Sequence, residues 1–440
     1  MTPITVVVVG GGAAGTLAAI HLARHPSGAA RRVVVVEPAG ELGSGAAYGT
    51  RSPSHLLNVR AMGMSAYPDD PDHFLAWAGR EGVTADGADF LPRMLYGRYL
   101  RDVLAGAAEH VRGRVIGLSA GSIGWRVALE AGEVLDADHV ILATGNTVAA
   151  VSGVPDHARI VPDPWAPDAI DGLRDAREVV LVGSGLTAVD VALSLRDIGH
   201  PGRLRMISSH GLLPEPHAPV PLPTVPPFVT SGDRAARSVR AALAAARDAT
   251  NAAGDWRQVV DGIRPQTVAL WRALPAEEQR RFLRHLSRRW DVRRHRMAPR
   301  IALAVRQLQE RGQLSVERGR LARLEVAGDQ IRVFVTHAGN ERVTDTDAVV
   351  MCIGPTTDPR RDPFLAGLLR AGVTTRHPLG MGLVVDIDGR LVAPNGVVQQ
   401  GLWAMGSLRK GAEWESTAVP ELRSQARDIA SSICATAGSS

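Results

Sequence analysis

The sequence is poor in cysteine and has no long hydrophobic run. Its 440 residues include only two cysteines, Cys352 and Cys434, and no C-x-x-C pair. This count excludes a disulfide framework, a zinc knuckle and a dithiol reductase centre. No apolar stretch approaches the length that crosses a bilayer, and the amino terminus lacks the charged region and cleavage site of a secretory signal. We therefore expect a cytoplasmic protein that does not bind a membrane.

Lysine and tyrosine are also scarce, and the net charge of +5 comes largely from arginine. Residues 280–300, RRFLRHLSRRWDVRRHRMAPR, are the most basic segment, and no aromatic stacking platform interleaves them. We interpret this segment as a solvated helix face, with an anion site as the alternative, and expect no nucleic-acid partner. His295 is expected to face solvent or a phosphate. No metal-ligand cluster and no nucleophilic triad is apparent, so neither a metal site nor a hydrolase is indicated.

A glycine-rich turn follows the first apolar strand. Residues 6–23 read VVVVGGGAAGTLAAIHLA, with Gly10, Gly12 and Gly15 at the G-x-G-x-x-G spacing between a β-branched run and a helical pattern. The first glycine permits a tight turn, the second lets the backbone approach a pyrophosphate, and the third allows close helix packing. The next strand ends in Glu37, where a carboxylate accepts hydrogen bonds from a ribose. The pattern predicts a dinucleotide site but does not separate NAD from FAD.

The same pattern occurs a second time in the chain. Residues 178–195, EVVLVGSGLTAVDVALSL, place Gly183, Gly185 and Ala188 at a G-x-G-x-x-A spacing. Short alternating strands follow each copy, at residues 113–146 and 319–355, and each set closes on an apolar strand that ends in glycine. The sequence therefore predicts an α/β fold with two Rossmann-like dinucleotide-binding domains, each with a β-meander. A helical insertion is expected in the second domain.

This layout resembles the flavoproteins with two dinucleotide-binding domains. VILATGN at residues 140–146 resembles the motif at which the chain leaves the FAD domain, and VVMCIGP at 349–355 resembles its counterpart. Further stretches are similar to a group of bacterial FAD/NAD(P)-binding proteins related to class B flavin monooxygenases and N-hydroxylases. These are HLLNVRAMGMSAYPDDPDHFLAW, FLPRMLYGRYL, FLRHLSRRWDVRRHRMAP and KGAEWESTAVPELRSQA. The resemblance extends over nearly the whole chain.

The resemblance implies FAD in the first domain and NAD(P)H in the second. The expected domains are 1–150 (FAD-binding, first part), 151–345 (NAD(P)-binding, with the helical insertion at about 212–312) and 346–440 (return to the FAD domain, with a C-terminal helix). Backbone N–H groups at the start of that helix would face the isoalloxazine and stabilise the negative charge of reduced flavin. Ser407 stands where relatives often carry an acid, which predicts weaker FAD retention. The expected FAD contacts are Gly10, Gly12, Ala14, Gly15, Glu37, Thr144, Gly145, Thr417, Ala418 and Val419.

The end of the second strand in the second domain favours NADPH, although NADH stays possible. Ser208, Ser209 and His210 stand there in place of the acid that would repel a 2′-phosphate. With Gly183 and Gly185 they are the expected nucleotide contacts. Arginines from residues 280–300 are a further candidate source of phosphate contacts.

The expected activity is that of an FAD-dependent, NAD(P)H-using monooxygenase. It would act through a C4a-hydroperoxyflavin and molecular oxygen on a small amine or thioether. The alternatives are a dehydrogenase or oxidase without oxygen insertion, and a cofactor-binding redox sensor or assembly factor. The insertion is interpreted as a cap over the cleft that supplies a substrate pocket or a homodimer surface. Candidate catalytic residues are His55, Asn58, Trp414 and Glu415, with Asn58 bonding the nicotinamide or hydroperoxide and Trp414 shielding the flavin.

Overall fold

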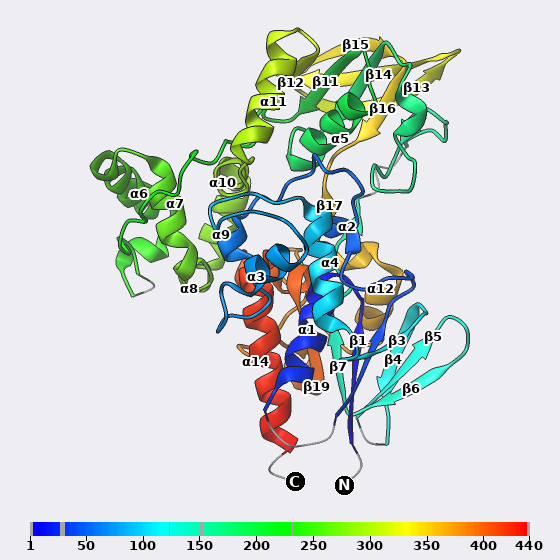
Figure 1. Ribbon diagram of the computed structural model, residues 1–440, viewed down its shortest axis with the longest axis vertical. Coiled ribbons are helices and arrows are strands. Elements are labelled where there is room, and N and C mark those ends of the chain that lie inside the picture. Colours follow the sequence, from blue (N-terminus) through cyan, green and yellow to red (C-terminus); the bar gives the residue numbers. More distant parts are fainter. Residues whose placement is uncertain (1–2, 27–30, 123, 150–152, 231, 438–440) are drawn as a thin grey trace.

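Two mainly parallel β-sheets organise the chain, with a helical segment to one side of them (Figure 1). The computed structural model describes residues 3–26, 31–122, 124–149, 153–230 and 232–437. The predicted fold class is confirmed, since each sheet carries helices on one face and a three-stranded meander on the other. The expected boundary at residues 150 and 151 lies outside the described residues, and the domain bounds stay a prediction.

The first sheet has the strand order β18-β19-β7-β1-β2-β3, parallel except for β18. Its strands are β1 (Ile4–Val9), β2 (Arg31–Val36), β3 (Glu109–Val111), β7 (His139–Leu142), β18 (Arg390–Val392) and β19 (Val398–Ala404). Side chains alternate between the faces of a strand, so Val6 and Val8 enter one core while Val7 and Val9 enter another. Continuous apolar runs such as VVVV therefore suit a strand that is buried on both faces.

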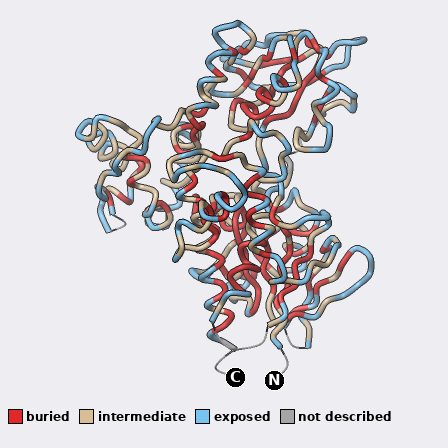
Figure 2. The backbone as a smooth tube through the Cα atoms, viewed as in Figure 1, coloured by how far each residue is buried: buried red, intermediate tan, exposed pale blue. Residues whose placement is uncertain are grey.

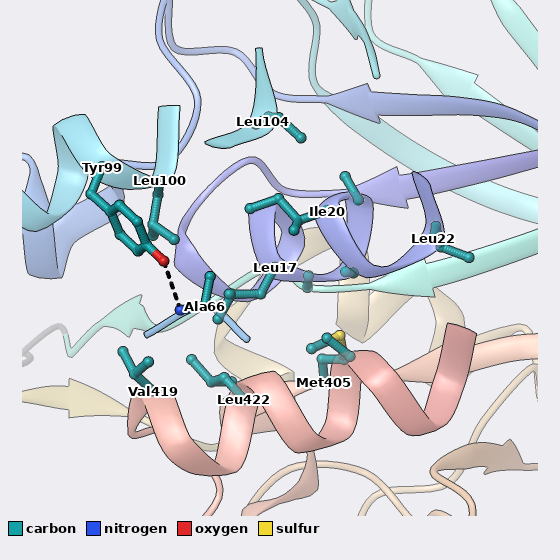
Figure 3. Close-up of a cluster of buried hydrophobic side chains, with 14 of the residues drawn as sticks. Leu17, Ile20, Leu22, Ala66, Tyr99, Leu100, Leu104, Met405, Val419 and Leu422 are labelled. Atoms are coloured by element: carbon teal, nitrogen blue, oxygen red, sulfur yellow. Dashed lines mark hydrogen bonds between the residues drawn. The ribbon is translucent and has the colours of Figure 1, made fainter. Parts of the chain in front are cut away.

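Helices cover one face of this sheet, and α14 packs along α1 (Figures 1 and 3). Leu17 and Ile20 of α1 meet Val419 and Leu422 of α14 in a core that also contains Tyr99, whose hydroxyl accepts a 3.0 Å hydrogen bond from the Ala66 N–H. The other face is covered by the meander and by α12. These elements are α1 (Ala13–Arg24), α2 (Gly45–Tyr48), α3 (His73–Arg80), α4 (Arg93–Leu104), α12 (Pro363–Arg370), α13 (Lys410–Glu413), α14 (Val419–Ala437), β4 (Val115–Ala120), β5 (Trp125–Leu129) and β6 (Val134–Ala137).

The second sheet repeats this plan with the order β12-β11-β10-β16-β9, all parallel. Leu181 of its central strand packs with α5 and α11, whereas Val180 and Val182 pack against the meander. Its elements are β9 (Ile160–Val161), β10 (Glu178–Val182), β11 (Arg203–Ser208), β12 (Leu314–Arg318), β16 (Ala348–Met351), α5 (Leu186–Asp197), α11 (Pro299–Glu310), β13 (Arg320–Ala327), β14 (Gln330–His337) and β15 (Asn340–Thr346). The chain passes between the two sheets twice, and the two connecting segments form a short antiparallel pair. Its strands are β8 (Thr147–Val148) and β17 (Pro355–Thr356).

The helical segment between β11 and β12 lies beside both sheets (Figure 1). Its helices are α6 (Val239–Ala253), α7 (Trp256–Ile263), α8 (Thr267–Ala273), α9 (Ala276–His285) and α10 (Ser287–Arg294), with short 3₁₀ turns at η3 (Arg234–Arg237) and η4 (Arg264–Gln266). We call α6–α10 with these turns the insertion. Helix α11 follows it and packs on the second sheet through Val305 and Leu308, so it serves as the crossover between β11 and β12.

Burial follows the two sheets and the helices beside them, while the outer part of the insertion lies at the surface (Figure 2). The remaining 3₁₀ turns are η1 (Ala61–Gly63), η2 (Asp171–Leu173), η5 (Pro359–Arg361) and η6 (Gly406–Arg409). Throughout the described ranges, every helix is too short or too polar to span a bilayer.

Candidate cofactor sites

The first glycine turn is built so that only its middle position is open. Gly10 has φ of +106°, and a β-carbon there would lie 2.4 Å from the carbonyl oxygen of Ala143. A β-carbon at Gly15 would lie 1.8 Å from the Gly10 oxygen, so α1 is packed against the turn. At Gly12, the residue before α1, a β-carbon would meet nothing closer than 3.8 Å. The start of α1 is therefore accessible to a group as close as a phosphate.

Glu37 lies beside this turn. Its carboxylate accepts hydrogen bonds from the Gly11 N–H at 2.7 Å and from the Ala39 N–H at 3.0 Å. These bonds hold the half-buried side chain at the carboxyl end of β2, next to the start of α1. The expected contact between Glu37 and a ribose stays a prediction.

The turn after β7 lies against the first glycine turn, because a β-carbon at Gly10 would lie 3.3 Å from the Thr144 Cα. Gly145 has φ of +72°, and a β-carbon there would meet nothing within 4 Å. The buried hydroxyl of Ser407 donates a 2.5 Å hydrogen bond to the Gly145 carbonyl oxygen. This serine therefore ties the segment after β19 to the turn that contains Thr144 and Gly145.

Helix α14 begins near the segment after β19, because a β-carbon at Gly406 would lie 3.4 Å from the Leu422 side chain. The Ala418 carbonyl accepts hydrogen bonds from the N–H groups of Glu421 and Leu422, while Thr417 is exposed and Val419 is buried in the core. The first N–H groups of a helix have no intrahelical acceptor. The expected donors at residues 417–419 thus lie at a helix start, as the sequence predicted, and their contact with flavin stays a prediction.

Trp414 lies just before that helix start and points toward the insertion. Its ring stacks on Trp271 of α8 with centroids 5.2 Å apart, and Phe282 of α9 meets it edge-on at 5.2 Å. The Lys410 Nζ lies 5.2 Å from the ring centroid. Trp414 has φ of +59°, a strained conformation for a residue other than glycine. The observed contacts therefore anchor the insertion to the C-terminal segment.

Glu415 is buried between the C-terminal segment and α10. Its carboxylate accepts a 2.9 Å hydrogen bond from Trp290 Nε1 and lies 3.2 Å from Arg294 Nε. Burial alone would raise the pKa of Glu415, but the charge of Arg294 beside it and the hydrogen bond from Trp290 lower that pKa. Glu415 is therefore held ionised.

The expectation that His295 faces solvent is corrected, because this residue is half-buried beside Glu415 and Arg294, and the phosphate alternative stays a prediction. Desolvation lowers the pKa of His295 to about 4. The interpretation of residues 280–300 as one solvated face is also corrected, since Arg294 and Arg296 are buried. The acids that pair with these two arginines, Glu415 and Asp261, are distant in sequence, so no local pattern indicates their burial.

His55 connects the two α/β units. Its Nδ1 bonds the Thr50 hydroxyl at 2.6 Å, and its Nε2 lies 2.8 Å from the Ser194 hydroxyl and 3.0 Å from the Asp190 carbonyl on α5. Arg93 of α4 forms an ion pair with the Asp190 carboxylate nearby. Burial lowers the pKa of His55, which is thus neutral in this contact. These bonds give His55 a linking role, and its catalytic role stays a prediction.

Asn58 follows on the same loop and is half-buried. Its backbone carbonyl accepts a 3.0 Å hydrogen bond from His217 Nε2. This bond joins the loop to the segment that enters the insertion. The structure therefore places the four candidate catalytic residues at contacts between parts of the fold, and their chemical roles remain predictions.

The second glycine turn has the same construction as the first. Gly183 has φ of +127°, and a β-carbon there would lie 2.2 Å from the Cys352 carbonyl oxygen, matching Gly10 and Ala143. Ala188 is fully buried at the third position. At Gly185, before α5, the nearest group to a β-carbon is an Arg288 nitrogen at 3.9 Å. The open middle position is thus flanked by a guanidinium from α10.

Arginines surround the carboxyl end of β11. Arg288 donates to the Leu212 carbonyl at 3.3 Å, and Arg318, at the end of β12, donates to the Ser209 carbonyl at 3.3 Å. Ser208 bonds the Ser184 hydroxyl at 2.7 Å, whereas Ser209 and His210 are exposed. The pKa of His210 is lowered first by desolvation and then by a set of positive charges. These are Arg288, Arg318, Arg289 and Arg320.

The arginines of the R-G-R turn between β12 and β13, Arg318 and Arg320, were missed by the sequence analysis. Their signal was a pair of arginines at the junction of β12 and β13, where β12 ends at the same edge as its parallel neighbour β11. Arg288 and Arg289, in contrast, come from the segment that was considered as a source of phosphate contacts.

Comparison with known proteins agrees with this geometry. Residues 7–147 match a family model described as FAD-NAD(P)-binding. Ornithine N-hydroxylase from Kutzneria sp. 744 is 18% identical with a TM-score of 0.64, over 99% of this chain and 100% of that one. The cadaverine monooxygenase of Erwinia amylovora, solved with FAD, is 14% identical with a TM-score of 0.68, over 99% and 95%.

The fold is shared more widely. The bacillithiol disulfide reductase of Staphylococcus aureus is 13% identical with a TM-score of 0.59, over 99% of both chains. No curated protein sequence matches the chain. The resemblance inferred from the motifs is confirmed by the hydroxylase and monooxygenase neighbours, and the chain has the two-unit fold that these enzymes share.

Proposed function

We propose that this protein is an FAD-dependent, NADPH-using monooxygenase that oxygenates a small amine. The observation that carries the proposal is the pair of glycine turns. In each turn, a side chain at the first glycine would clash with a carbonyl oxygen, so glycine is required there. The middle glycine leaves the start of a helix accessible. This is the arrangement that a dinucleotide pyrophosphate requires.

The first turn suits FAD. The residues that would hold it are Gly12 at the start of α1, Glu37, and the turn at Gly145 that Ser407 braces. The helix start at Ala418 would place N–H groups and a positive dipole end at the flavin. When bound, FAD supplies the redox chemistry and the reaction with oxygen, while the protein positions it and excludes water.

The second turn suits NADPH better than NADH. The end of β11 lacks the acid that recognises a 2′-hydroxyl, and four arginines surround it. A guanidinium group binds phosphate with paired donors, so Arg318 and its neighbours favour a 2′-phosphate. Arg288 lies where the pyrophosphate would approach Gly185.

An amine substrate is supported by the neighbours, which include an ornithine N-hydroxylase solved with NADP⁺ and L-ornithine and a cadaverine monooxygenase. Disulfide reduction, the activity of another neighbour, is not favoured by the thiols of this chain. Cys352 is buried beside the second turn, and burial raises the pKa of its thiol well above the usual range. Such a thiol is a poor nucleophile.

A steady-state assay tests the proposal. The purified protein is loaded with FAD, and NADPH oxidation, oxygen uptake and hydrogen peroxide are followed with ornithine, lysine, cadaverine and a thioether. We expect an amine that accelerates oxygen uptake, yields an N-hydroxylated product and suppresses peroxide. Peroxide equal to the NADPH consumed with every compound would favour the oxidase alternative.

A further inference from the structure

Two segments that the dinucleotide sites do not explain meet in the structure. One is WDVRRHR at residues 290–296 of α10 and its end, and the other is WES at 414–416 before α14. Trp290 Nε1 donates to one Glu415 oxygen, and Arg294 Nε lies 3.2 Å from the other. The side chains of Arg294 and Glu415 are each 6% exposed, so this ion pair is almost fully removed from water.

A second ion pair connects the insertion to the same place. Arg264 donates to the two Glu421 oxygens at 3.0 and 3.1 Å, and Arg294 Nη2 lies 3.9 Å from Glu421. Glu421 is in the first turn of α14. Both carboxylates at this helix start are therefore balanced by guanidinium groups that belong to the insertion.

This balance matters for the group that the helix start would face. Reduced flavin gathers negative charge, which a helix N-terminus stabilises and a nearby unpaired carboxylate opposes. Removing one member of a buried ion pair leaves the other charge uncompensated in a medium of low polarity. The charge state at residues 415–421 thus depends on an arginine from another part of the fold.

We infer that Arg294 is a positioning residue through which the insertion neutralises Glu415 and so raises both the affinity for FAD and the reduction potential of the bound flavin. The inference rests on the proposed function, because it places flavin at the start of α14. It gives the insertion a role in flavin chemistry in addition to its expected role as a cap.

The test uses the full-length protein and three variants, Arg294→Gln, Glu415→Gln and the double variant. The matched control is Arg296→Gln, because Arg296 is equally buried near the same helix end but pairs with Asp261 inside the insertion. The readouts are the dissociation constant of FAD from the apoprotein and the midpoint potential of the bound flavin at pH 8.

We expect Arg294→Gln to weaken the binding of oxidised FAD about tenfold and the binding of reduced FAD by about a further factor of ten. The midpoint potential of the bound flavin then shifts by about −30 mV for two electrons. Glu415→Gln leaves the arginine unpaired and is expected to shift the potential upward. The double variant should return toward the wild-type potential, and Arg296→Gln should leave it unchanged.

Equal potentials in Arg294→Gln and Arg296→Gln would overturn the inference, as would a downward shift in Glu415→Gln. If Arg294→Gln does not fold, the upward shift in Glu415→Gln still decides the matter. A wild-type protein that binds no FAD would instead refute the proposed function, so the two failures are distinguishable.

Discussion

A methyl group at Gly185 separates a ligand-binding role of the second turn from a purely structural one. Gly185 has φ of −83°, which alanine adopts freely, and its β-carbon would meet only Arg288 at 3.9 Å. The free protein should therefore tolerate Gly185→Ala. A bound pyrophosphate would not, since the methyl group occupies the space through which phosphate reaches the start of α5.

The magnitude follows from the contacts that would be lost. A hydrogen bond to a charged group contributes about 1.5–3 kcal/mol, and about 1.4 kcal/mol is a tenfold change in binding. Gly185→Ala should thus weaken NADPH binding roughly tenfold to a hundredfold, while unfolding stability changes by less than about 0.5 kcal/mol.

The assay measures the rate of flavin reduction against NADPH concentration by rapid mixing, together with thermal unfolding. Gly79→Ala is the control, because Gly79 is an exposed residue of α3 with nothing within 4 Å of its β-carbon. Wild-type NADPH affinity in Gly185→Ala, with unchanged stability, would refute the argument that this turn approaches the pyrophosphate.

Three further predictions concern other parts of the molecule. Arg318→Ala should raise the KM for NADPH about tenfold and leave that for NADH unchanged, because a charge-assisted phosphate contact is lost; equal effects on both nucleotides would contradict the assignment. His55→Ala should lower the free energy of unfolding in urea by about 1–3 kcal/mol, since it breaks hydrogen bonds between the two units, while the flavin spectrum is retained; lost turnover with unchanged stability would instead favour a catalytic role. The protein should lose stability as the pH falls below about 6.5, because burial lowers the pKa of His217 to about 3 and that of His295 to about 4. Below pH 6.5 the unfolded chain binds more protons than the native one, so each histidine lowers the free energy of unfolding by up to about 1.4 kcal/mol per pH unit, until the pH reaches its folded pKa. His217→Gln should therefore reduce the pH dependence of the free energy of unfolding in urea between pH 7.5 and 5. An unchanged pH dependence would argue against this cause.

The features that the sequence predicted are those encoded locally. The strand, glycine turn and helix at Gly10 and Gly183 each lie within about twenty consecutive residues, and the meanders follow from alternation of apolar residues. The start of α14 was likewise readable from Pro420 and Glu421 in its first turn. Local signals of this kind predict where an element lies in the sequence, but they do not predict which other elements it contacts in the fold.

The features that the sequence did not predict depend on contacts between distant segments. His55 and Ser194 are 139 positions apart, and Trp290 and Glu415 are 125 apart. A buried charge such as Arg294 looks like a surface residue until its acidic partner is known, because unpaired arginines are rarely buried. The role of Ser407 was similarly hidden, since its hydroxyl acts on the Gly145 carbonyl.

The most direct test of the central claim is a rapid-mixing spectrum. The FAD-loaded protein is reduced anaerobically with NADPH and mixed with oxygenated buffer, with and without an amine. The account predicts reduction by NADPH, then a transient absorbance band between those of reduced and oxidised flavin, whose decay the amine accelerates. Direct return to oxidised flavin with stoichiometric hydrogen peroxide, unaffected by any amine, would contradict it.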